Sequence, residues 1–384
     1  MVTAPFTVAV WSGDMVTRHG WIGDPLSVVV TERFNGVSTG VVTVSAAHHL
    51  MTPLTTPGVR LTVDYHPSGT SQTRRVLSGR ISHWEGDGPS VSGTVALSVE
   101  GDFRKLREVL GWPVPGNALG SQSSAYYTPA SAPAETVLKN AATANMVTRL
   151  GLPITVAADS ARGANVKVTS RFHTLEDRLV QAVEGAGLGI SMVQDDTSGA
   201  IVLDVFEPAA YPRDLTEQGG TVLSWSWSRT APRATRVIAG DQGEAAARSF
   251  TTTIDTARES EWDDVVEVFI DARDTADAAT LTQRRADALA EGAPLSGLSI
   301  ELAEAGAFRY GVTGGVAVGD EVTVEVGPGV TITDVLRECT LSWTKDAGFK
   351  VSPAVGAVTD SPERTMARFV SRLARAVKDL QAGR

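Results

Sequence analysis

The chain has 384 residues, and its 44 acidic and 34 basic residues give a formal net charge of −10 at pH 7. This charge disfavours a protein whose task is to grip nucleic acid, because phosphate binding depends on lysine and arginine. The single cysteine, Cys339, excludes an intrachain disulfide and a cysteine-rich zinc site.

At roughly 150 residues per domain, the length of the chain predicts two or three domains. We expect the protein to be made in the cytoplasm, for two reasons. No segment approaches the ~18 consecutive apolar residues of a membrane span, so we expect no stable membrane insertion. Residues 1–15 lack a basic residue before an apolar run, which argues against a secretory signal. The acidic charge suits solubility, and it would also suit a surface that DNA passes without binding.

The first block, residues 5 to about 100, alternates between apolar and polar residues as half-buried strands do. Its clearest part is residues 28–44, which predict a hairpin with its turn at Asn35-Gly36 and with Phe34 packed inward. Further strands are predicted at 6–11, 59–65 and 91–99, separated by turn residues. Short strands at this spacing favour a small antiparallel barrel or sandwich.

The middle of the chain changes to mixed helix and strand. After a short helix at 102–110 and a Ser-, Gly- and Pro-rich stretch, apolar spacing predicts helices near 134–150 and from 174 to about 185. Strands are predicted at 189–193 and 200–206. From residue 221 the pattern returns to strands, with one helix at about 275–291 and a long hairpin over 319–344.

The last segment, residues 361–384, predicts a basic amphipathic helix that begins at Ser361-Pro362. It either docks on its own domain or binds a partner or another copy of the chain. Its apolar stripe is a candidate interface, made of Met366, Phe369, Leu373 and Leu380.

A search for catalytic and metal-binding patterns gives little. The six histidines contain no His-Glu-x-x-His spacing, and adjacent His48 and His49 on a strand would point to opposite faces. The densest carboxylate pairs, Asp195-Asp196 and Asp263-Asp264, sit at turns, where aspartate bonds local backbone. We therefore expect no enzyme activity, no cofactor and no metal.

Two tryptophans, Trp225 and Trp227, share one face of a predicted strand. They fit a barrel core, a contact between subunits or a platform for sugars, since tryptophan is enriched at interfaces. We treat both as candidate interface residues.

Ordered short motifs run from about Val8 to Gly356. They are Arg33-Phe34-Asn35, Thr56-Pro57-Gly58, Val76 to Ile81, Val99 to Asp102, Leu110 to Pro115, Arg171 to Leu175, Arg236 to Gly240 and Val318 to Val324. With this order the chain resembles the minor tail proteins of actinobacterial siphophages that form the tail hub.

The resemblance implies a mainly β fold in which two small β-barrel domains flank an α+β domain. We assign residues 1–112 to the first barrel, 113–220 to the linker and α+β domain, 221–356 to the second barrel with an inserted helix, and 357–384 to the C-terminal helix. The resemblance also implies a virion location at the tail tip and a homotrimeric ring that closes the tail tube and lets DNA through. The implied partners are the distal tail ring, the tape-measure protein and downstream fibres.

Two other functions remain open from the residues alone. One is a peptidoglycan or glycan hydrolase of the tail tip, which would use a pair of carboxylates. The other is a carbohydrate-binding receptor module built on Trp225 and Trp227.

Overall fold

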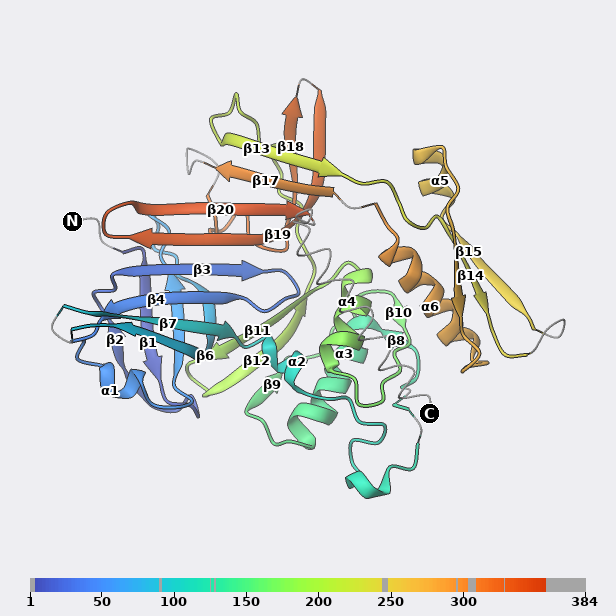
Figure 1. The fold of residues 1–384 in the computed structure, drawn as a ribbon, viewed down its shortest axis with the longest axis horizontal. Coiled ribbons are helices and arrows are strands. Elements are labelled where there is room, and N and C mark those ends of the chain that lie inside the picture. The colour runs from blue at the N-terminus through green and yellow to red at the C-terminus, as the bar shows by residue number, and fades with distance from the viewer. Residues whose placement is uncertain are drawn as a thin grey trace.

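The largest element of the fold is a sheet of 12 strands drawn from both ends of the chain (Figure 1). The computed structural model describes residues 4–89, 92–124, 126–127, 129–243, 248–294, 296–302, 309–327 and 329–356. The strand order is β13-β17-β20-β19-β3-β4-β7-β6-β5-β1-β2, and β18 pairs with β19 beside this path. The strands are β1 (Phe6–Trp11), β2 (Arg18–Ile22), β3 (Ser27–Arg33), β4 (Thr39–Ser45), β5 (Arg60–Tyr65), β6 (Arg74–Asp87), β7 (Thr94–Gly101), β13 (Val222–Arg229), β17 (Ser296–Leu302), β18 (Glu321–Gly327), β19 (Val330–Thr344) and β20 (Gly348–Gly356).

The pairing of β3 with β19 joins the two β blocks. β3 pairs with β4 as the predicted hairpin, and its other edge runs antiparallel to β19 from Ser27 opposite Thr344 to Arg33 opposite Glu338. The prediction of two closed barrels is not confirmed, because within the described residues the strands form one open sheet that ends at β2 and β13. The free backbone groups of β3 bond to β19, so the first and last blocks share one sheet.

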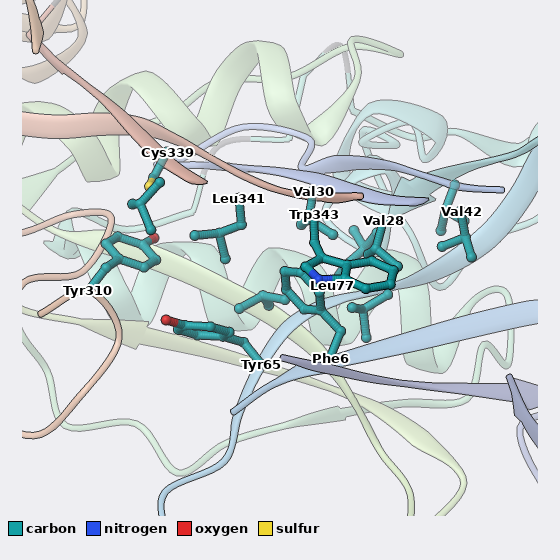
Figure 2. Close-up of a cluster of buried hydrophobic side chains, with 14 of the residues drawn as sticks. Phe6, Val28, Val30, Val42, Tyr65, Leu77, Tyr310, Cys339, Leu341 and Trp343 are labelled. Carbon is teal, nitrogen blue, oxygen red and sulfur yellow. The ribbon is translucent and has the colours of Figure 1, made fainter. Parts of the chain in front are cut away.

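The core of this sheet collects alternate residues from strands far apart in sequence. Figure 2 shows Phe6 and Tyr65 facing Trp343 and Leu77, with Val28, Val30 and Leu341 alongside. Phe6 and Tyr65 have ring centroids 5.7 Å apart, and each also packs against the ring of Phe349, at 5.7 Å and 5.2 Å. The curled sheet therefore buries one continuous apolar core.

The middle of the chain forms an α+β layer with its own apolar core. In this layer β11 and β12 form an antiparallel hairpin, and β9 adds in parallel to β12. Among the described residues, none of the helices combines the length and apolar character needed to cross a bilayer. The elements of this layer are α2 (Arg104–Glu108), β8 (Ala132–Pro133), α3 (Ala134–Ala142), β9 (Ile154–Val156), β10 (Asn165–Val166), α4 (Gln181–Gly185), β11 (Gly189–Asp195) and β12 (Ala200–Phe206), whereas the short helix α1 (Met51–Leu54) packs against the large sheet.

A second, smaller sheet lies between β13 and β17 in the chain. Its order is β15-β14-β16, and helix α6 covers one face through Leu289, which packs with Val237. Figure 1 shows α6 between this sheet and the α+β layer. The sequence predicted β14, β16 and α6, but it missed β15 and α5, whose polar residues give no clear periodicity. The elements are β14 (Arg236–Gly240), β15 (Phe250–Ile254), α5 (Thr256–Trp262), β16 (Glu267–Asp271) and α6 (Ala278–Glu291).

Gly79 in β6 lies where the backbones of β6 and β7 come closest. A Cβ atom at Gly79 would lie 1.9 Å from the carbonyl oxygen of Glu100, whereas a Cβ at Gly86 in the same strand meets nothing nearer than 3.7 Å. We expect Gly79→Ala to destabilise the chain by about 3 kcal/mol, because backbone, unlike a side chain tip, cannot move aside cheaply. Gly86→Ala is the matched control, expected within about 0.5 kcal/mol of the wild type in urea unfolding. Equal midpoints for the two variants would contradict this close approach.

Candidate functional site

The turn of the β3–β4 hairpin lies against the α+β layer. Asn35 is 9% exposed and adopts a left-handed φ of 48°, a conformation that asparagine tolerates better than most residues. Its side chain Nδ2 donates to the carbonyl oxygen of Leu188 at 3.0 Å, and its Oδ1 accepts from the backbone nitrogen of Ile190 at 2.8 Å. The carboxamide thus binds the start of β11, and the turn connects the large sheet to the next layer.

Phe34 makes the apolar part of the same contact. Its ring meets the ring of Phe206 edge-on, with centroids 6.3 Å apart. Gly319 has a positive φ of 100°, and a Cβ there would approach both rings at 3.1 Å. Three distant segments, the hairpin, the end of β12 and the loop before β18, therefore meet at Phe34.

Arg33 completes the hairpin's contacts. Its Nε donates to Glu338 Oε2 at 2.9 Å, and its Nη1 donates to the Val37 carbonyl and the Thr39 hydroxyl. Each side chain of the Arg33–Glu338 pair is about one-third exposed, at 35% and 32%. Solvent screening limits such a pair to about 1 kcal/mol or less, so it orients the hairpin more than it stabilises the fold.

A buried polar cluster lies beside the hairpin. Arg60 in β5 donates through Nη2 to both oxygens of Asp102, at 2.8 Å and 2.6 Å, and through Nε to Gln194 Oε1 at 3.0 Å. The Ser78 hydroxyl donates to Asp102 at 2.8 Å and accepts from the Gln194 backbone nitrogen at 2.9 Å. Since Gln194 belongs to β11, this cluster fixes the α+β layer to the large sheet.

Arg75 makes a second bridge between the same two layers. It donates to Asp64 in β5 and to Asp196 in the β11–β12 turn, with a shortest distance of 2.7 Å to Asp196. Burial alone would lower the pKa of Arg75, but the hydrogen bonds that it donates to Asp196 and Asp64 raise it. Asp196, predicted to bond local backbone in a turn, also forms an ion pair with Arg75.

Glu32 in β3 is a second buried carboxylate near this junction. It accepts from Arg74 Nη2 at 2.9 Å and from the Tyr310 hydroxyl at 2.8 Å. Burial raises the pKa of Glu32, and Arg74 and Tyr310 only partly offset that effect. Burial also raises the pKa of the nearby Cys339 thiol well above its ordinary value, which leaves it an inert core residue (Figure 2).

A cavity of about 290 Å³ lies where these contacts meet, lined by Glu32, Phe34, Arg74, Leu77, Met192 and Phe206 among others. Its charged groups are engaged in ion pairs within the chain. The described residues contain no cluster of three or more histidine, cysteine or carboxylate side chains placed to hold a metal ion. The arrangement suits holding three segments together.

The predicted interface tryptophans lie on β13, an end strand of the described sheet. Trp225 is partly buried against the sheet's core, and its Nε1 donates to Glu217 at 2.7 Å. Trp227 is 47% exposed. The two therefore differ in surroundings, and their role as interface residues stays a prediction. The other predicted interface residues lie outside the described part of the chain: Met366, Phe369, Leu373 and Leu380.

Comparison with known proteins gives the chain a family. The profile of the family described as Siphovirus ReqiPepy6 Gp37-like protein matches residues 7–357. The chain belongs to this family of siphovirus proteins. No curated protein sequence gives a significant match.

Solved phage tail proteins share the fold of this Gp37-like chain. A prophage tail protein from Listeria monocytogenes EGD-e is 12% identical with a TM-score of 0.57, over 96% of this chain and 99% of that one. The 43 kDa tail protein of prophage MuSo2 from Shewanella oneidensis is 13% identical with a TM-score of 0.56, over 91% and 98%. A tail protein from Neisseria meningitidis MC58 is 12% identical with a TM-score of 0.54, over 92% and 96%. At these identities the likeness is one of fold.

The resemblance to siphophage tail proteins is thus confirmed at the level of the family. In this Gp37-like chain, the Arg33-Phe34-Asn35 motif forms a junction between the large sheet and the α+β layer. Sequence reasoning missed the partners of that motif, Leu188, Phe206 and Glu338, because nothing local in the sequence pairs them. Asp102 lies at the start of the predicted helix at 102–110 and directly after β7, and this position was the available signal for the buried cluster.

Proposed function

We propose that this chain is a structural hub protein at the tip of a siphophage tail. The observation that carries the proposal is the family match over residues 7–357, which spans both β blocks and the α+β layer between them. The shared fold with three phage tail proteins, each covered almost completely, supports it. The charged groups at the hairpin junction are engaged in internal contacts, which suits a part that carries load.

In the proposed hub three copies of the chain form a closed ring, as identical subunits commonly do. Each copy contributes two barrel-like units, one from residues 1–112 and one from 221–356, so that six units face the hexameric tail tube. The α+β domain at 113–220 lies between them. The β3–β19 seam would hold the two units of one copy at a fixed spacing.

The ring would close the tail tube, anchor the distal tail ring, the tape-measure protein and downstream fibres, and open for DNA. The chain's net charge of −10 supports the last role, because an acidic channel wall repels the phosphate backbone. Assembly would take place in the host cytoplasm, and the finished ring would remain in the virion.

Labelling of intact virions tests the location. An antibody against this chain, read by immunogold electron microscopy, is expected to mark the tail tip at the end opposite the head. Label along the tail shaft or on the capsid would overturn the hub assignment.

Zymography of the purified chain on peptidoglycan distinguishes the hub from a hydrolase. A zone of clearing that disappears on a single Asp or Glu substitution would favour the hydrolase.

A further inference from the structure

The smaller sheet β15-β14-β16 has one face covered and one face open. Residues facing α6, such as Val237 and Ala239, are fully buried. Strand alternation places Phe250, Ile254 and Phe269 on the opposite face, which we call the outer face. Their exposed fractions are 57%, 42% and 53%. Val265, two residues before β16, is 50% exposed.

The apolar side chains of the outer face are contiguous. The rings of Phe250 and Phe269 have centroids 6.4 Å apart, and the Arg248 guanidinium lies over both at 5.6 Å and 5.5 Å. Arg248 also donates to Asp271 at 2.6 Å, and its side chain is only 10% exposed. Two large rings held in place and left half exposed are typical of a surface that another element covers.

The charges around the outer face are mostly acidic. Asp263, Asp264 and Glu267 are exposed residues at the start of β16, and Asp271 at its end is 50% exposed despite its pair with Arg248. An element that covers the apolar strip would therefore be favoured if it carried basic side chains on its flanks.

Residues 361–384 have this composition. The sequence predicts a helix with the apolar stripe Met366, Phe369, Leu373 and Leu380, and the segment holds six basic and two acidic residues in a chain whose net charge is −10. A helix of 24 residues is about 36 Å long, whereas each five-residue strand of the small sheet is about 17 Å long. The helix is therefore long enough to cross the whole outer face. The segment therefore offers an apolar stripe that can cover the apolar strip of the outer face and basic side chains that can meet the acidic residues around it.

The described chain ends near the end of the small sheet at which β14 begins. Gly356 in β20 pairs with Gly297 in β17, and Gly297 lies five residues after Gly292. The Gly292 carbonyl accepts from the backbone nitrogens of Arg233 and Ala234, directly before β14. That end of the sheet carries Ile254 and Val265, and the four residues 357–360 can span about 13 Å.

We propose that the segment 361–384 docks, as an amphipathic helix, on the outer face of the small sheet in its own chain. The apolar stripe covers Phe250, Phe269 and Ile254, and the arginines of the segment face the acidic residues around β16. The smaller sheet then has a helix on each face, with α6 on the inner one.

Hydrogen exchange of the full-length chain tests the docking. Peptides from 366–380 are expected to exchange at least about tenfold more slowly than an unstructured chain, because a docked helix opens only with its contacts. In Phe250→Ser/Phe269→Ser this protection is lost, while peptides from β3 and β19 keep theirs. Val330→Ser, at a residue 51% exposed in the β18–β19 hairpin, is the control that leaves the protection intact. Free exchange of 366–380 in the wild type, or unchanged protection in the double variant, would overturn the proposal.

Cross-linking decides which chain the segment covers. Thr252→Cys on the outer face and Val370→Cys in the segment are joined by a short bismaleimide, and native Cys339 is fully buried. A linked product of monomer mass, found also at high dilution, is the expected result. A product of two or three chains, or no linkage, contradicts docking within one chain and assigns the segment to another copy or another partner.

Discussion

Replacing Asp102 with alanine is expected to destabilise the chain by about 3–5 kcal/mol. Asp102 is 1% exposed and accepts two bonds from Arg60 and one from the Ser78 hydroxyl. Without it the guanidinium of Arg60, a residue 4% exposed, stays buried with its charge uncompensated. Urea unfolding followed by tryptophan fluorescence measures the change.

Two variants show whether the loss comes from the stranded charge. Glu338→Ala removes the acceptor of Arg33 in a pair that is one-third exposed, and it should cost about 1 kcal/mol or less. Arg60→Met/Asp102→Leu removes both charges of the buried pair and should be clearly more stable than Asp102→Ala. If Asp102→Ala costs no more than Glu338→Ala, the buried cluster does not fix the α+β layer to the sheet.

Leu341→Ala is expected to cost about 2–5 kcal/mol, because it opens a cavity in the core at the seam of the two β blocks. Leu341 has no exposed surface and lies in β19 opposite Val30 of β3 and Val351 of β20. Since both blocks border the same cavity, hydrogen-exchange protection should fall together in β4 and in β20.

Val41→Ala is the matched control for Leu341→Ala. Val41 lies in β4 of the large sheet and is 38% exposed, so its substitution removes an aliphatic side chain without opening a buried cavity. Its loss should change stability by about 0.5 kcal/mol or less. A loss of protection in β20 alone after Leu341→Ala would mean that the two blocks open independently and that the seam does not unite them.

Local patterns in the sequence predicted most of the individual elements. Alternation placed β3 and β4 within a residue or two of their true limits, and apolar spacing located α6. Strands with few apolar residues escaped this reasoning. β15 is Phe-Thr-Thr-Thr-Ile, and only its two end residues are apolar.

The arrangement of the elements was harder to predict, because it depends on contacts between distant residues. Nothing local in β3 indicates that its second neighbour is β19, about 300 residues later, so the sequence suggested two separate barrels. The contacts of the β3–β4 turn with the α+β layer also depend on distant residues. Asn35 suggested a turn, but its partners Leu188 and Ile190 are known only from the folded chain.

Cryo-electron microscopy of the tail tip of intact virions tests the central claim most directly. The account predicts three copies of this chain in one ring at the distal end of the tube, with two β units of each copy facing the hexameric tube. A reconstruction in which this fold occurs elsewhere on the virion, or as single copies at the tip, would contradict the proposed hub.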